Sequence, residues 1–353
     1  MEWAIDTFGD SGVLVLIGAL VGLLFGASAQ HSRFCLRAAT VEVADLRAGP
    51  KLGIWLIAFC AAVCAVQLAI LAEVFDPVEA RQLAATGSMS GAILGGLMFG
   101  SGMILARGCA SRLLVLSATG NLRAIVTGLV LTLVAQASLR GVLSPVREAL
   151  GAMWVVPGGE ARSLLTQLGL GHGPAAVLAG LGLAVGLWLA AREGLRASQL
   201  VAACFVGLAV AAGWVLTFAL AQTSFEVIAI SSVTFTGPST DTLMGLVNTT
   251  ELPLSFGLGL IPGVFLGSFL MSVPKGEFRI ERFGSDTPME RYLLGAALMG
   301  FGSMLAGGCA VGAGVTGGAI FAITAWVAVF AMWVGAVATE LGMRRYRQAL
   351  SLA

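Results

Sequence analysis

Long apolar runs separated by short polar connections dominate the chain. A run of about 20 apolar residues is long enough to cross the hydrocarbon of a bilayer as a helix. The hydrophobic pattern predicts nine such spans, which lie near 12–29, 52–72, 89–106, 123–139, 174–191, 198–221, 253–273, 291–307 and 318–341. The fold class predicted from this pattern is therefore an all-α integral membrane protein.

Composition and charge agree with this fold class. Of the 353 residues, 58% are hydrophobic and only 11% are charged, whereas about 25% of a soluble domain is charged. The net charge of +1 argues against a nucleic-acid partner. Basic residues follow the first span and end the chain, while the first residues carry only acids. The positive-inside rule then predicts an N-terminus outside the cell and a C-terminus in the cytoplasm.

An internal repeat is the strongest signal in the sequence. The segment GSGMILARGCA at 100–110 matches GFGSMLAGGCA at 300–310 in seven of eleven positions. The copies fall in the third and eighth spans, and an offset of five spans reverses the direction across the membrane. The repeat therefore predicts one transmembrane domain over 1–353, with inverted halves at about 11–140 and 198–341 and a linking span at 174–191.

Short segments between the spans predict re-entrant half-helices. Two of them, Cys35 to Leu46 and Ser111 to Ala118, are long enough for a short helix. A third follows Gly237-Pro238-Ser239-Thr240, where proline suits the first turn of a helix. Broken helices are tolerated at membrane depth only where they are buried in protein or line a polar cavity.

Cysteines at such helix starts suggest an anion pathway. The N-terminus of a helix offers free amides and partial positive charge, and a neutral thiol adds a weak donor. Glycines beside the cysteines let the backbone bend or approach an ion, although GxxxG spacing elsewhere is more typical of helix packing. The candidate pathway residues are Cys35, Cys109, Cys309, Gly100, Gly102, Gly108, Gly300, Gly302 and Gly308.

Other polar or reactive residues carry less weight. Cys60, Cys64 and Cys204 lie inside apolar runs and are expected to be inert. Arg107 and Arg112 at the end of a span are expected to reach the membrane interface. The sequence predicts no metal site, no cofactor and no enzyme motif of the common nucleotide or hydrolase types.

Three sequence stretches resemble the YeeE/YedE family of bacterial inner-membrane proteins. They are LLFGASAQHSRFC (Leu23 to Cys35), GGLMFGSGMILARGCASRLL (Gly95 to Leu114) with SATGNLR (Ser117 to Arg123), and GFGSMLAGGCAVGAG (Gly300 to Gly314). The resemblance implies uptake of thiosulfate or a related sulfur compound through nine spanning helices and central half-helices. It also implies that Cys35, Cys109 and Cys309 pass the ion along, and that a small cytoplasmic TusA-like sulfur carrier acts as a partner.

Alternative functions remain open at this stage. Arg112 and Leu113 follow GCAS, where many members of the family have a glycine or Gly-His-Gly, so selenium or another sulfur species is an alternative substrate. A membrane sulfurtransferase forming a cysteine persulfide would need a reactive thiolate. A structural subunit, whose glycines only pack, would tolerate replacement of all three cysteines.

Overall fold

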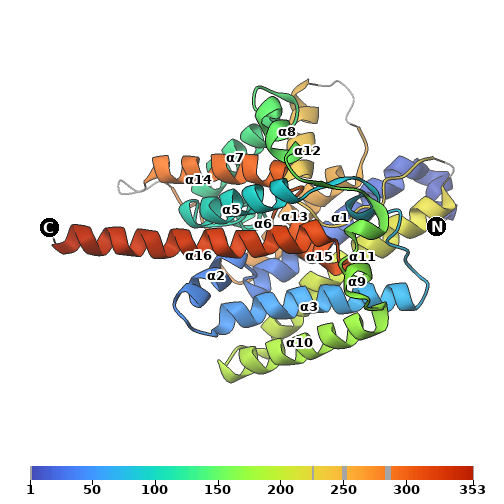
Figure 1. The fold of residues 1–353 in the computed structure, drawn as a ribbon. Helices are drawn as coiled ribbons and strands as arrows, with labels where there is room; N and C mark the ends of the chain where they lie inside the picture. The colour runs from blue at the N-terminus through green and yellow to red at the C-terminus, as the bar shows by residue number, and fades with distance from the viewer. Residues whose placement is uncertain (1, 225, 249–252, 283–287, 353) are drawn as a thin grey trace.

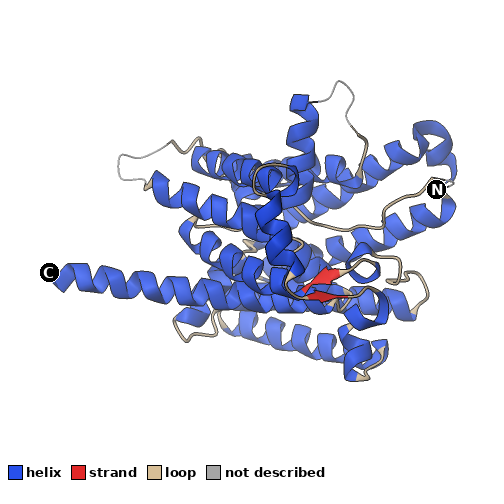
Figure 2. Ribbon diagram, turned by 45° about the horizontal axis from the view of Figure 1, so that its top comes forward, coloured by secondary structure: helices blue, strands red, loops and turns tan. Residues whose placement is uncertain are grey.

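The computed structural model describes residues 2–224, 226–248, 253–282 and 288–352, and it is almost entirely helical (Figures 1 and 2). The long helices run roughly along one direction, with the N-terminus and the C-terminus at opposite ends (Figure 1). A two-stranded antiparallel sheet pairs β1 (Gly87–Ser88) with β2 (Val155–Val156). The fold is thus that of an all-α integral membrane protein, as the sequence predicts.

Long helices alternate with short ones along the chain. The long helices are α1 (Glu2–Ser32), α3 (Pro50–Leu71), α5 (Met89–Leu105), α7 (Leu122–Arg140), α10 (His172–Arg192), α11 (Ala197–Thr223), α13 (Phe256–Ser272), α14 (Met289–Leu305) and α16 (Ile323–Leu352). The short ones are α2 (Leu36–Ala44), α4 (Arg81–Ala84), α6 (Ala110–Ala118), α8 (Ser144–Ala152), η1 (Gly159–Arg162), α9 (Leu164–Leu168), α12 (Thr236–Asn248), the π-helical turn η2 (Ala310–Thr316) and α15 (Gly317–Ala319).

The number of full spans differs from the nine predicted. Among the described residues, seven helical segments are long and apolar enough to cross a membrane. An eighth is the pair formed by α14 and the following 310–319 segment, which is bent by 40°. Helix α13 is apolar but only 17 residues long. It is thus shorter than the predicted span at 253–273.

The last predicted span begins too early. The sequence predicts a helix over 318–341, whereas η2 and α15 end in a turn and α16 begins only at Ile323. Phe321 in this turn has a φ of 54°, and Ala322 N–H donates to the Gly317 carbonyl at 3.1 Å. The apolar run continues across the turn because Gly317, Gly318 and Ala319 are buried inside the protein. Hydrophobicity alone therefore merges a re-entrant segment with the span that follows it.

The connection between α7 and α10 is more ordered than its polar sequence indicates. It contains α8, η1 and α9, and it supplies β2 to the small sheet. Arg162 in η1 is buried and donates 2.6 Å hydrogen bonds to the Ala85 carbonyl and the Thr324 hydroxyl. These bonds fasten the connection to the start of α16.

Helices α5 and α14 cross through reciprocal glycine contacts. A Cβ added to Gly102 would lie 2.6 Å from the Gly295 carbonyl oxygen, and one added to Gly302 would lie 2.7 Å from the Gly95 carbonyl oxygen. Positions 95 and 102 thus meet positions 302 and 295, which are their counterparts in the repeat. Self-complementary contacts of this kind are what a two-fold axis between two copies produces.

Candidate functional site

The same local turn precedes each of three cysteines. Cys35, Cys109 and Cys309 are the residues just before α2, α6 and η2. Two positions earlier the backbone is left-handed, with φ of 57° at Arg33, 56° at Arg107 and 79° at Gly307. The residue before each cysteine donates to a carbonyl five residues back: Phe34 to Ala29 at 3.1 Å, Gly108 to Met103 at 3.1 Å and Gly308 to Ser303 at 2.8 Å. This turn ends one helix and immediately starts another in a new direction.

Two of these thiols are brought together. The side chains of Cys35 and Cys109 are close neighbours. The Cys109 Sγ atom also lies 3.3 Å from the Ser111 hydroxyl. Cys109 is 1% exposed, while Cys35 is half-buried. The starts of α2 and α6 therefore form one thiol-rich cluster, defined here as the thiol pair Cys35–Cys109.

Cys309 lies at the start of η2, a neighbour of α6 from later in the chain. Its Sγ atom accepts a hydrogen bond from Gly312 N–H at 3.4 Å, and the residue is 1% exposed. Helix η2, which it begins, contacts α6. The Thr316 hydroxyl of η2 donates to the Val233 carbonyl at 2.5 Å. The two copies of the Gly-Cys-Ala repeat thus lie on elements in direct contact.

The fourth half-helix, α12, has a buried hydroxyl on its first residue. Helix α12 starts at Thr236, close to the position that Pro238 predicts. Thr236 is 1% exposed, and its hydroxyl has no hydrogen-bond partner among the residues that the structure describes. It lines a cavity of about 320 Å³ together with Ala110, the residue after Cys109. Sequence reasoning found the helix start but not this residue.

Arg112, which the sequence predicts to reach the membrane interface, is half-buried and lies near the thiol pair. Its guanidinium donates to the Gln30 amide oxygen at 3.4 Å and acts electrostatically on Cys35. Arg37 acts on Cys35 as well. Arg112 belongs to the first turn of α6, and its hydrogen-bond partner, Gln30 of α1, is buried.

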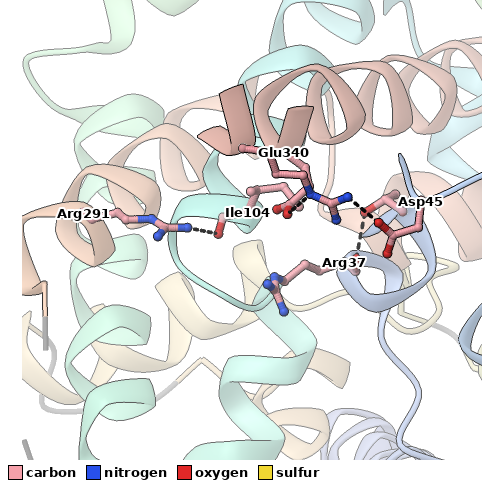
Figure 3. A network of polar contacts seen from close by, with 7 residues as sticks. Arg37, Asp45, Ile104, Arg291 and Glu340 are labelled. Carbon is pink, nitrogen blue, oxygen red and sulfur yellow. Dashed lines mark hydrogen bonds and ion pairs between the residues drawn. The ribbon is translucent and has the colours of Figure 1, made fainter. Parts of the chain in front are cut away.

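Figure 3 shows how the surrounding charges are arranged. Arg344 of α16 pairs with Asp45 and, at 2.9 Å, with Glu340, while the Arg291 guanidinium donates to the Ile104 carbonyl at 3.2 Å. The Arg37 guanidinium points away from Asp45 (Figure 3), and its buried Nε has no partner among the described residues. Positive charge near Cys35 is therefore not neutralised by the nearby carboxylates.

The candidate glycines fall into two groups. Gly100, Gly102, Gly300 and Gly302 lie where helices cross, facing α16, α14, α7 and α5 respectively. Gly308 lies in the turn before Cys309, where an added Cβ would come within 2.7 Å of Ala313 N. At Gly108 the nearest atom would be 3.4 Å away, on the Leu113 side chain. The two equivalent glycines therefore face different steric limits.

Comparisons with known proteins agree with each other. A family model described as "Sulphur transport" matches residues 31–338. A protein named thiosulfate transporter TsuA from Escherichia coli strain K12 is 26% identical over 348 residues, covering 91% of this chain and 92% of its own length. A protein of the same name from Spirochaeta thermophila is 29% identical over 331 residues, covering 89% of this chain and 94% of its own.

Proposed function

Because the chain belongs to the sulphur transport family, we propose that it carries thiosulfate or a closely related sulfur-containing anion across the bacterial inner membrane. The family match covers most of the chain, and both relatives are named as thiosulfate transporters. No covalent chemistry is needed for this function, so the protein is proposed to be a transporter and not an enzyme.

One observation carries the pathway: three helices begin at cysteines, and two of the thiols are in contact. An anion entering a site of low dielectric must exchange its water for other donors. Helix starts supply amides and partial positive charge, and the thiols supply S–H donors. These weak donors let an ion enter and also leave, as conduction requires.

The pathway residues divide by task. Cys35, Cys109 and Cys309 contact the ion, and Gly108 and Gly308 shape the turns that present two of them. Their four companions, Gly100, Gly102, Gly300 and Gly302, hold the helices from which these turns emerge. In this proposal, Cys309 receives the ion from the thiol pair or delivers it there, because η2 and α6 are in contact.

The proposed architecture is an inverted repeat with halves at about 11–140 and 198–341, and α10 as the link. The reciprocal contacts of Gly102 with Gly295 and of Gly302 with Gly95 support it. The C-terminal end is proposed to face the cytoplasm because Arg344, Arg345 and Arg347 lie there. A TusA-like sulfur carrier is proposed to receive the ion on that side.

Uptake of labelled thiosulfate into liposomes containing the purified protein tests the proposal. Excess thiosulfate is expected to block uptake, and excess sulfate, which lacks the terminal sulfur, is expected to block it much less. Selenite is added as a third competitor. Cys109→Ala and Cys309→Ala are each expected to lower the initial rate by at least about tenfold. Cys204→Ala is the matched control because Cys204 lies within α11 and outside the half-helix starts. Full activity in both test variants would rule out the cysteine pathway.

Thiol labelling separates transport from persulfide chemistry. A sulfurtransferase needs a thiolate, which reacts rapidly with iodoacetamide at neutral pH. Transport by neutral donors predicts slow labelling of Cys35, the half-buried member of the thiol pair, even without substrate. Rapid labelling together with trapped persulfide would instead establish the enzyme.

A further inference from the structure

A basic pocket of about 460 Å³ lies where several helix ends meet near the C-terminal face. It is bounded by the end of α1, the starts of α3 and α11, and the segment after α13. Its charged lining residues are Arg33, Lys51, Arg196, Lys275 and Glu277, together with His31. Four permanent cations therefore face one carboxylate among the residues that line it.

The one carboxylate occupies a central place among these groups. Glu277 accepts a hydrogen bond from the Gln30 amide at 2.7 Å and pairs with Arg33 at 3.2 Å. Lys275 touches the His31 ring, so two nitrogen groups meet there with no acid between them. Positive charge exceeds negative charge inside the pocket, so the pocket can accommodate a further anion.

Polar contacts lead from this pocket to Arg112, in the first turn of the helix that Cys109 begins. Gln30 is 6% exposed, and its two amide atoms have different partners. Its nitrogen donates to Glu277, while its oxygen accepts from Arg112 at 3.4 Å. Arg112 in turn lies three residues after Cys109 in the chain. Basic residues that only orient a protein in the membrane would not need this buried bridge, in which Gln30 joins Glu277 of the pocket to Arg112.

We propose that this pocket binds a small doubly charged oxyanion and that Glu277 holds the place of this ion between binding events. The inference rests on the proposed function, since the ion would be the transported one, waiting between the thiol pair and the C-terminal face. An arriving dianion takes the place of Glu277 on Arg33 and the place of His31 on Lys275, and the Glu277 carboxylate moves out toward solvent. Competition from Glu277 keeps the site weak enough for release.

The chemistry of the pocket predicts how selective it is. Its donors are ammonium, guanidinium and imidazole groups, which read charge and oxygen atoms and have no preference for a terminal sulfur. Sulfate and thiosulfate are therefore expected to bind here equally well. Discrimination between them belongs to the thiols, so the two sites differ in a measurable property.

Equilibrium binding of labelled sulfate to the purified full chain in detergent tests the pocket. The double variant K51Q/K275Q is expected to weaken sulfate binding by about tenfold or more, because two charged contacts are lost. Glu277→Gln is expected to tighten binding by about tenfold, since the competing charge disappears while an amide can still contact Gln30. Arg345→Gln, a cation outside the pocket, is the control and should change binding less than about twofold. A gain of affinity cannot come from misfolding, so Glu277→Gln keeps the test decisive.

The outcomes separate this inference from the proposed function. If thiosulfate uptake is normal and K51Q/K275Q leaves sulfate binding unchanged, the pocket proposal alone is wrong. Sulfate binding that follows the variants, with no thiosulfate uptake, would leave the pocket standing and overturn the transport proposal. The measurement is repeated in nanodiscs of phosphatidylcholine with and without phosphatidylglycerol. Equal binding is expected, and loss with phosphatidylglycerol would show instead that a lipid headgroup fills the pocket.

Discussion

The thiols of Cys35 and Cys109 are close neighbours, although they begin two different helices, α2 and α6. A hydrogen bond between two thiols would require at least one of them to keep its S–H as the donor. The contact also joins the first two half-helices of the chain at their positive ends. An ion bound at the start of one of these helices therefore interacts electrostatically with the start of the other.

Proximity of the two thiols predicts a disulfide under oxidation. Diamide, as the oxidant, is expected to link Cys35 to Cys109 and to abolish thiosulfate uptake, and dithiothreitol should restore it. Peptide mass spectrometry of the oxidised protein identifies the bridge. Cys60 and Cys64 serve as the internal control, because cysteines on consecutive turns of one helix are not expected to reach disulfide geometry. A bridge from Cys109 to Cys309 in place of Cys35 would contradict the arrangement described here.

The glycines at the α5–α14 crossing are expected to limit stability. Gly102→Ala and Gly302→Ala each place a Cβ within 2.7 Å of a carbonyl oxygen on the opposite helix. Overpacking of this kind costs about 1–3 kcal/mol. Thermal unfolding in detergent should therefore show a lower midpoint for both variants.

Gly128→Ala is the matched control for these substitutions. Gly128 lies inside α7 and has nothing within 4 Å of an added Cβ. Alanine there is expected to leave the midpoint unchanged or to raise it, since glycine is the weaker helix former. If all three variants behaved alike, close helix packing would not be what these glycines provide.

The two glycines that precede the repeated cysteines are expected to respond differently. Gly308→Ala would press a Cβ against Ala313 N at 2.7 Å and displace η2, whereas Gly108→Ala meets only the Leu113 side chain at 3.4 Å. Initial thiosulfate uptake should fall by about tenfold or more in Gly308→Ala and stay within about twofold of the parent in Gly108→Ala. The reverse order of activities would show that Gly108, and not Gly308, has the more crowded surroundings.

The contact between α16 and the loop after α2 is expected to depend on pH. Arg344 holds the pKa of the Asp45 carboxyl below its usual range by hydrogen bonding to it. Because the folded pKa lies below the unfolded value of about 3.9, the stabilisation is present above that value. It is lost as the pH falls through the lower folded pKa.

A pair of spin labels, at Leu46 and at Arg345, measures this opening. The distance between them should broaden on strong acidification in the parent protein. Asp45→Asn should show the broadened distance already at neutral pH and little further change with acid. A pH response that survives in Asp45→Asn would assign it to another group.

The sequence predicts the helical starts of the candidate site well because glycine, proline and the repeat act locally. The helices after Cys35 and Cys109 and near Pro238 follow from residues adjacent in the chain. Contacts that depend on packing were not predictable in this way. Gln30 meets Glu277 only because α1 and α13 pack together, and it meets Arg112 only because α1 and α6 are in contact.

Apolar composition also hides the difference between spanning and re-entrant segments. The 310–319 segment is as apolar as a span, because burial in protein and burial in lipid select the same residues. The predicted span at 318–341 was wrong at its start for this reason. The left-handed turn at Phe321 marks the boundary between the re-entrant segment and α16. A phenylalanine in the sequence does not predict a left-handed turn.

The left-handed turn found before Cys35, Cys109 and Cys309 has a consequence for how this fold can diversify. Each turn is built from backbone hydrogen bonds and a positive φ, and none of these involves the thiol itself. The backbone turn therefore fixes the position two residues after its left-handed residue, and it does so for any side chain at that position. Exchanging the thiol for a hydroxyl at this position would change the ligand chemistry without rebuilding the scaffold.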